Sequence, residues 1–150
     1  MNKFCSHSPE ETREFAKKLA RLAFPGAVIA LWGTLGAGKT AFTQGLALGL
    51  DIAGEIASPT FALMHVHEGR LPLYHFDLYR LAGEEDLDTV GADDYWFGRG
   101  VSAIEWPQRA GALLPENRLD VEITVGEGTE RTLCLTAHGA RYEQWLEELP

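Results

Sequence analysis

The chain has 150 residues, 45% of them hydrophobic and 23% charged, which excludes a disordered protein and predicts a single domain over residues 1–150. The formal net charge of −9 makes the chain a poor stand-alone binder of a phosphate backbone, so we expect no strong nucleic-acid binding without a partner. No apolar run could cross a bilayer, the N-terminus lacks a signal-peptide core, and Cys5 and Cys134 are isolated, so we expect a cytoplasmic protein without membrane contact or structural disulfide.

The first third of the chain predicts a helix, a strand and a second helix. In "SPEETREFAKKLARLA", Ser8 is the expected N-cap, Pro9 fits the first helical position and Glu11 completes a capping box. The apolar residues of this helix recur at three- and four-residue spacing and predict one buried stripe of Phe15, Leu19 and Leu22. "PGAVIALWG" then predicts a buried strand, and an apolar helix follows over residues 39 to about 50.

The rest of the chain predicts two hairpins, one central strand and short helices. The first antiparallel hairpin turns at residues 67–70, and the second, within "RLDVEITVGEGTERTLCLTAHG", turns at residues 126–128. "AGEEDLDTVGADDYWFG" predicts helical pieces and loop, while "GVSAIEW" is typical of a strand covered on both faces. "ARYEQWLEEL" predicts a terminal helix. We therefore expect a layered α/β fold with a mixed central sheet and antiparallel hairpin additions.

The stretch "GTLGAGKT", Gly33 to Thr40, has the G-x-x-x-x-G-K-[ST] spacing of a phosphate-binding loop. Its glycines permit backbone angles closed to other residues, so that amide N–H groups can converge on a phosphate at the positive end of the next helix. Lys39 can reach the β- and γ-phosphates, and the Thr40 hydroxyl can coordinate Mg²⁺. A glycine-rich packing turn would not explain the Lys-Thr pair, so we predict a nucleotide site in a three-layer P-loop NTPase fold.

Two acidic residues compete for the position that fixes Mg²⁺ or the attacking water. Asp77 ends "PLYHFD", which has the shape of a Walker B strand, and Glu105 ends the more apolar "VSAIE". A carboxylate at the carboxyl end of a sheet strand lies beside the phosphate loop in folds of this type, and the sequence does not decide between the two. His65, His67 and His75 share one face of the first hairpin, where we expect a solvated cluster rather than a zinc site.

Other features narrow the class of nucleotide-binding protein. The chain lacks N-K-x-D, and Arg80 rather than glycine lies three residues after Asp77, which disfavours a GTPase of the Ras type. A small-molecule kinase would carry an arginine-rich lid, but the basic candidates Arg80, Arg99 and Arg109 are scattered. Without an obvious arginine finger we expect slow turnover by the chain alone. A small-molecule kinase and a nucleotide-dependent binding module without required hydrolysis remain as alternatives.

With these pieces in place the chain resembles the TsaE (YjeE) family of bacterial P-loop ATPases. The resemblance covers the chain from the first helix through "RLDVEI" and rests on "GTLGAGKT", "SPTF", "YHFDLYRL", "GADDYW" and "AIEW" in this order. It implies a slowly hydrolysing ATPase that serves a TsaB–TsaD pair in making N6-threonylcarbamoyladenosine at position 37 of tRNAs reading codons that begin with A. It also implies that tRNA is reached only through this complex, and that ATP and Mg²⁺ are the cofactors.

The resemblance also implies roles for single residues. Lys39, Asp77 and Glu105 correspond to catalytic positions, Thr60 of "SPTF" to a switch residue that senses the γ-phosphate, and Thr40 with Glu105 to the metal ligands. Relatives commonly carry an acid where this chain has Thr34, so binding should survive through the backbone while any role of that acid is in doubt. The implied nucleotide-binding residues are Gly33, Thr34, Leu35, Gly36, Ala37, Gly38, Lys39, Thr40, Ala41 and Trp106.

Overall fold

A computed structural model describes residues 2–34, 36–54, 63–81, 86–87 and 91–149. Its N-terminal half contains β1 (Asn2–Ser6), α1 (Pro9–Arg21), β2 (Val28–Trp32), α2 (Lys39–Gly49), β3 (Met64–His67) and β4 (Leu73–Asp77). Its C-terminal half contains α4 (Ala92–Trp96), β5 (Val101–Glu105), the 3₁₀ helix η1 (Pro107–Leu113), β6 (Arg118–Val125), β7 (Arg131–His138) and α5 (Ala140–Glu148).

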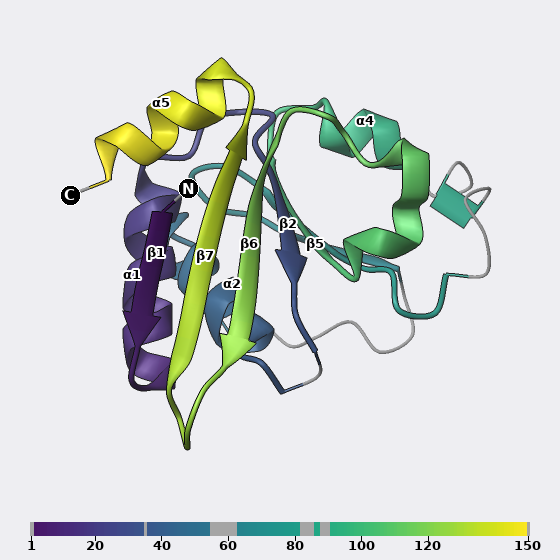
Figure 1. Cartoon of the computed structure of the whole chain (residues 1–150). Coiled ribbons are helices and arrows are strands. Elements are labelled where there is room, and N and C mark those ends of the chain that lie inside the picture. The colour runs from purple at the N-terminus through teal and green to yellow at the C-terminus, as the bar shows by residue number, and fades with distance from the viewer. Residues whose placement is uncertain (1, 35, 55–62, 82–85, 88–90, 150) are drawn as a thin grey trace.

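The strands form one seven-stranded mixed sheet in the order β1-β7-β6-β2-β5-β4-β3, and Figure 1 labels the strands from β1 to β5 of this order. The four inner strands β6, β2, β5 and β4 run parallel, and antiparallel neighbours extend the sheet on both sides. All five residues of β5 are buried, as expected for a central strand. The predicted α/β fold with a mixed sheet and hairpin additions is confirmed. Because the four inner strands are parallel, their carboxyl ends meet at one edge, where ligands bind in folds of this type.

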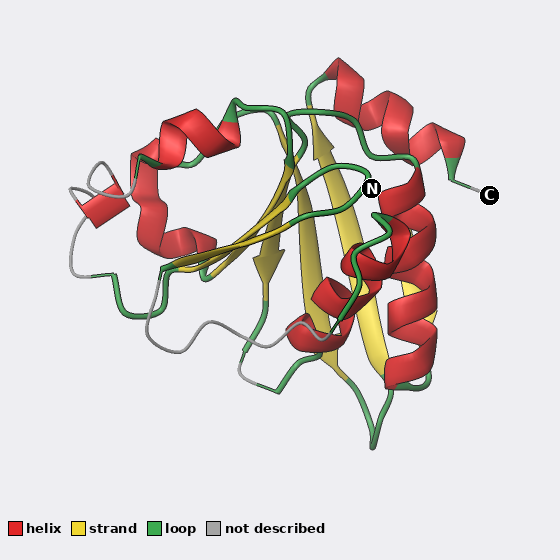
Figure 2. Ribbon diagram, turned by 180° about the vertical axis from the view of Figure 1, so that it is seen from behind, coloured by secondary structure: helices red, strands yellow, loops and turns green. Residues whose placement is uncertain are grey.

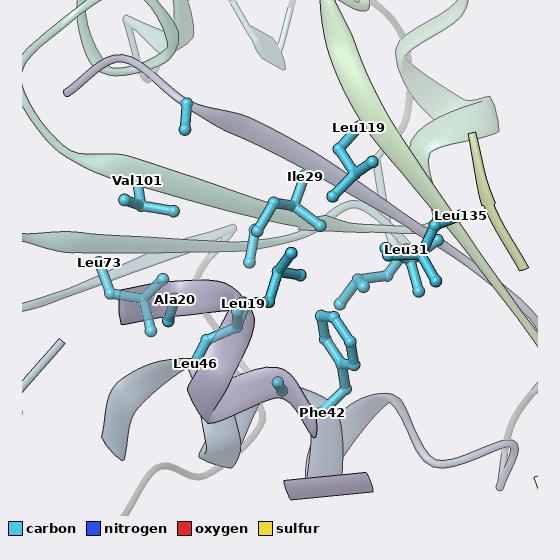
Figure 3. Packing of buried hydrophobic residues seen from close by; sticks show 14 of the residues in the cluster. Leu19, Ala20, Ile29, Leu31, Phe42, Leu46, Leu73, Val101, Leu119 and Leu135 are labelled. Carbon is cyan, nitrogen blue, oxygen red and sulfur yellow. The ribbon is translucent and has the colours of Figure 1, made fainter. Parts of the chain in front are cut away.

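Helices cover the sheet on both faces. On one face α1 and α2 lie across the strands, as Figure 2 shows from behind, and α5 adds Tyr142 and Trp145 to the same core. Figure 3 shows side chains of these helices, among them Leu19 and Phe42, packed against Ile29 and Leu31 of β2. On the other face α4 and η1 pack against Phe76 and other residues of β2, β4 and β5. The sheet is thus the middle of the three predicted layers, and each outer helical layer packs on it through an apolar cluster.

The first helix begins as its sequence predicts. The Ser8 hydroxyl accepts a hydrogen bond from the Glu11 N–H at 3.1 Å, and Pro9 occupies the first turn. The Glu11 carboxylate accepts from the His7 N–H at 3.2 Å, one residue before the N–H used in a standard capping box. These contacts satisfy N–H groups that the helix itself cannot, and they fix where α1 starts.

Two glycines let α1 and α2 approach each other closely. A Cβ atom on Gly45 would lie 2.3 Å from the Arg13 carbonyl oxygen and 2.7 Å from the Ala16 Cβ. One on Gly49 would lie 2.6 Å from the Ala20 Cβ. Both alanines are fully buried, so the small residues set the distance between the helices. That spacing holds α2, and with it the loop that precedes it, against the sheet.

Three local features differ from the sequence predictions or were absent from them. Residues 2–6, for which no strand was predicted, form β1 because they pair with β7 and because Phe4 stacks on Phe15 at 4.5 Å between ring centroids. The first hairpin turns over residues 68–72 rather than 67–70, since His67 is still paired with Leu73. The 3₁₀ helix η1 was not predicted either. No helix in the described ranges is long and apolar enough to span a bilayer.

A polar cluster ties β2 to β6 and β7. Asp120 accepts hydrogen bonds from Trp32 Nε1 at 2.8 Å and from Arg118 Nε at 2.9 Å, and its second oxygen lies 2.7 Å from His138 Nε2. Burial by itself raises the pKa of Asp120, but the hydrogen bonds from Trp32, Arg118 and His138 outweigh it, and the pKa is lowered. The carboxylate therefore stabilises this part of the sheet as long as it is charged.

Candidate functional site

The predicted phosphate loop, residues 33–40, connects the end of β2 to the start of α2. Gly33, Gly36 and Gly38 have φ angles of 148°, 78° and 113°, so the loop has the backbone shape that only glycine adopts readily. At Gly33 both the backbone conformation and the available space disfavour a side chain, because a Cβ atom there would lie 2.8 Å from the Ile123 carbonyl oxygen of β6. Gly38 caps α2 in the left-handed conformation. The loop thus presents backbone amides at the positive end of α2, which suits an anion.

The Lys39 side chain crosses this loop. Its Nζ donates to the Gly33 carbonyl oxygen at 3.0 Å and lies 4.1 Å from the ring centroid of Trp106, and the residue is only 5% exposed. Burial lowers the pKa of Lys39, while the charges of Glu105 and Asp77 oppose that shift. An ammonium group held here, close to both carboxylates, has the charge and position to contact a phosphate bound by the loop.

The two competing acids are direct neighbours in the sheet. Asp77 of β4 is paired with Glu105 of β5, and Glu105 is in turn paired with Leu31 of β2 just before the loop. Burial raises the pKa of Asp77, with a further contribution from the Glu105 charge. Both acids therefore end their strands at the edge of the sheet where β2 leads into the loop. The structure places side by side the two candidates between which the sequence did not decide.

The Glu105 carboxylate is held by a histidine. His75 Nε2 lies 2.5 Å from Glu105 Oε2, and the two side chains are 1% and 6% exposed. An ionised carboxylate can only accept, so in that state His75 donates from Nε2. His75 Nδ1 is buried and has no hydrogen-bond partner among the described residues. The contact fixes the Oε2 oxygen of the Glu105 carboxylate.

The expected solvated histidine cluster is therefore wrong for its buried member. His75 lies within the sheet, opposite His65 on β3, and the rings of His65 and His67 are 6.2 Å apart. Burial lowers the pKa of His67, and the neighbouring His75 and His65 lower it further. In the part of the chain that the structure describes, no three metal-ligating side chains are arranged to hold an ion. Of the three histidines, His75 is the one that contacts the Glu105 carboxylate.

Trp106, directly after Glu105, has a left-handed backbone with φ 57° and ψ 51°. This conformation is costly for a bulky residue and marks sites where the surroundings over-determine the backbone. It turns the indole under Lys39 and beside Tyr79, whose ring centroid lies 5.0 Å away. Tyr79 is 46% exposed, and the Arg109 guanidinium lies 5.8 Å from its ring. The aromatic pair thus extends from the lysine to the protein surface.

The remaining predicted site residues are either more exposed than Lys39 and Glu105 or lie outside the described residues. Thr40 is exposed and Ala41 half-buried in the first turn of α2, and Thr34 is exposed on the loop. Leu35 and Thr60, with the rest of "SPTF", lie outside the described residues. Arg80, Arg99 and Arg109 are all exposed.

The sequence analysis did not identify one residue that lies beside the loop. Arg131, at the start of β7, donates hydrogen bonds to the carbonyl oxygens of Gly36 and Ala37. No motif contains it, and it follows the loop by more than ninety residues. The only signal in the sequence is its position just after the turn of the second hairpin. Because β6 runs parallel to β2, this turn lies at the same edge of the sheet as the loop that follows β2.

Comparisons with known proteins agree on one family. The family model described as "Threonylcarbamoyl adenosine biosynthesis protein TsaE" matches residues 6–133. The curated tRNA threonylcarbamoyladenosine biosynthesis protein TsaE of Bacillus subtilis is 45% identical over 143 residues, covering 95% of this chain and 89% of that protein. The protein of the same name from Treponema pallidum is 47% identical over 120 residues, covering 80% of this chain and 89% of its own. The crystal structure of YdiB from B. subtilis superposes with a TM-score of 0.84 at 41% identity, covering 99% of this chain and 93% of that one.

Proposed function

This chain belongs to the TsaE family of threonylcarbamoyl adenosine biosynthesis proteins, and we propose that it serves that pathway as an ATPase. It would bind ATP with Mg²⁺ at the loop from Gly33 to Thr40 and hydrolyse it slowly by itself. The observation that carries the proposal is the meeting of three elements at one edge of the sheet. The positive end of α2, the buried Lys39 and the paired acids Asp77 and Glu105 all lie there.

The residues of this edge fit a magnesium-bound triphosphate. Mg²⁺ prefers oxygen ligands and is commonly bound by one or two carboxylates together with substrate phosphates. The Glu105 carboxylate, steadied by His75, and the Thr40 hydroxyl are oxygen donors of this kind at the carboxyl end of β5 and the start of α2. Thr40 and Glu105 would hold the ion, which would supply positive charge that offsets the negative charge of the phosphates.

The protein's own contribution would be positioning and electrostatics. Loop amides and Lys39 would hold the phosphates, and Asp77, one strand from Glu105, would orient the attacking water. The raised pKa of Asp77 makes its carboxylate a better proton acceptor than an exposed aspartate. Trp106 would confine the lysine and the nucleotide on the side of η1. Turnover by the chain alone should be slow, because the arginines considered as fingers, Arg80, Arg99 and Arg109, are exposed to solvent.

The partners in this proposal are homologues of TsaB and TsaD in the cytoplasm, with tRNA contacted only through them. The family's role in tRNA modification supports a link to that complex. The net charge of −9 supports indirect contact, because an acidic protein repels a phosphate backbone at long range. The half-exposed Tyr79 beside Trp106 gives the nucleotide site an aromatic surface that a partner could cover.

The first experiment measures Mg·ATP binding by calorimetry and ATP hydrolysis with and without TsaB and TsaD. We expect binding by the chain alone, slow hydrolysis, and a faster rate in the complex. Lys39→Met should reduce hydrolysis by about 100-fold or more, as loss of one charge-stabilising donor does. Lys18→Met, an exposed position on α1, is the matched control and should change nothing. Equal and fast rates with and without partners would contradict the proposal.

A second experiment separates hydrolysis from binding. Glu105→Gln keeps the side-chain shape and the acceptor for His75 but removes the negative charge that would hold Mg²⁺. We expect hydrolysis to fall by at least about 100-fold while the nucleotide still binds, and repeated tRNA modification to stop. If modification continues through many turnovers with this variant, the protein is a nucleotide-dependent binding module instead.

A further inference from the structure

A cationic side chain from the far end of the sequence lies against the outside of the phosphate loop. Arg131 Nε donates to the Ala37 carbonyl oxygen at 3.1 Å and Nη2 to the Gly36 carbonyl oxygen at 3.4 Å. The opposite side of the guanidinium faces the β6–β7 turn, where Nη1 donates to the carbonyl oxygens of Gly128 at 2.9 Å and Glu130 at 2.7 Å. One planar group thus bridges two backbone segments through four carbonyl oxygens.

These contacts determine which way the loop amides point. In a trans peptide the C=O and the N–H of the same plane point in opposite directions. Holding the Gly36 and Ala37 carbonyls against Arg131 therefore turns the N–H groups of Ala37 and Gly38 away from it, toward the inside of the loop. The Ala37 N–H donates a hydrogen bond to the Thr34 carbonyl oxygen at 3.1 Å (N to O) across the loop, which agrees with this direction and already engages this one amide. Amides that point inward are what a phosphate needs.

The segment that anchors Arg131 is itself braced. The Gly126 N–H donates to the Glu130 carbonyl oxygen at 2.9 Å and closes the β6–β7 turn. The Thr129 hydroxyl donates to the His7 carbonyl oxygen at 2.7 Å, which ties the turn to the residue before the N-cap of α1. Arg131 therefore connects the loop to a fixed part of the fold.

Carbonyl dipoles engage the charge of Arg131. Among the described residues, no carboxylate lies within salt-bridge distance of its guanidinium. A surface arginine with only a solubilising role would not be expected to place its donors on four backbone oxygens. Carbonyls that point outward from a loop are otherwise satisfied by water, which leaves the peptide planes free to rotate.

We infer that Arg131 is a positioning residue of the nucleotide site, which holds the loop at Gly36 and Ala37 in the shape that receives phosphate. The inference rests on the proposed function, since it assigns a role to Arg131 in binding Mg·ATP. Arg131 would act through the loop backbone, since the hydrogen bonds that its guanidinium donates go to backbone carbonyl oxygens. The effect should appear in nucleotide affinity, for ADP as much as for ATP, and much less in the rate of the saturated enzyme.

The size of the effect follows from the fraction of molecules with a correctly shaped loop. If Arg131→Gln leaves the loop in the binding shape about a tenth of the time, the apparent Kd rises about tenfold. Arg131→Lys keeps the charge, but a single ammonium group cannot span the four carbonyls as a planar guanidinium does. We expect this variant to resemble Arg131→Gln. Arg21→Gln, at the end of α1, removes a positive charge elsewhere and should bind as the wild type does.

The test combines calorimetry of Mg·ATP and Mg·ADP binding with hydrogen exchange of the nucleotide-free chain. At a temperature where every variant is folded, we expect both Arg131 variants to bind about tenfold more weakly and to exchange the amides of residues 36–41 faster, with β4 and β5 unchanged. Wild-type affinity in Arg131→Gln would overturn the inference even if its melting temperature falls, because the role would then be structural only. Wild-type affinity in Arg131→Lys would also overturn it, because charge alone would suffice. If the wild type takes up no Mg·ATP, the proposed function fails instead, and unchanged exchange at residues 36–41 would still refute the positioning of the loop.

Discussion

The buried pair of His75 and Glu105 can be tested without any nucleotide. The change is His75→Leu, made in the wild type and in a Glu105→Gln background, so that four proteins form a double-mutant cycle. In the wild type the leucine leaves a carboxylate that is 6% exposed without its hydrogen-bond donor. In the Gln background the leucine removes a partner from a neutral amide only.

The magnitude follows from the burial of the pair. Removing one partner of a buried, hydrogen-bonded charge pair costs about 3–5 kcal/mol of stability, whereas leaving a neutral buried group unpaired costs about 1–3 kcal/mol. We therefore expect a coupling free energy of about 2 kcal/mol between the two positions. The packing change from histidine to leucine occurs in both backgrounds and cancels, as does the loss of the attraction between Glu105 and Lys39.

The assay is equilibrium unfolding in urea, followed by circular dichroism, on the four proteins under identical conditions without nucleotide or Mg²⁺. The matched control is His65→Leu in the same two backgrounds, since His65 faces His75 across the hairpin but forms no hydrogen bond with Glu105 in the described structure. Residues that do not interact couple by less than about 0.5 kcal/mol. A coupling that small for His75 would refute the claim that this histidine holds the Glu105 carboxylate.

Three further predictions concern the scaffold that carries the site. Gly45→Val places a side chain against Ala16 of α1 and should lower the free energy of unfolding by about 3 kcal/mol or more, seen as a lower urea midpoint; an unchanged midpoint would contradict the close helix contact. Tyr142→Phe removes the hydroxyl that accepts the buried Val28 N–H at 2.9 Å and should cost about 1–3 kcal/mol in the same measurement; a variant as stable as the wild type would contradict the importance of this hydrogen bond. Asp120→Asn should be less stable than the wild type at pH 7. Because the pKa of Asp120 is lowered in the folded state, the difference in free energy of unfolding between the two proteins should be fully present above about pH 4. It should disappear as the pH falls through the folded pKa. A stability difference that grows in acid would refute the lowered pKa of Asp120.

The sequence predicted the local elements well because short-range rules fix them. Ser8 and Pro9 placed the start of α1 correctly, and the loop glycines have the positive φ angles that their spacing requires. The apolar run of β5 predicted a strand buried on both faces, which is confirmed. Each of these predictions depends on residues a few positions apart, whose sterics and hydrogen bonds act without the rest of the chain.

The first strand shows where such rules stop. The "NKFCS" segment of β1 carries little pattern of its own, and it becomes a strand because β7 offers a free edge and Phe15 a surface for Phe4. The partner strand begins more than a hundred residues later in the chain, so no local window contains the reason for it. The longer turn of the first hairpin has a similar origin, since the register of β3 on β4 fixes its length.

By itself the sequence determined the phosphate-binding motif, its place between a strand and a helix, and two acids that each end a strand. Only the tertiary structure decided that Asp77 and Glu105 stand side by side, that His75 rather than solvent meets Glu105, and that Arg131 lies against the loop. The physical reason is that backbone angles, caps and strand periodicity are set by neighbours along the chain. Contacts between residues 30 or 94 positions apart instead depend on the order and register of the strands in one cooperative sheet.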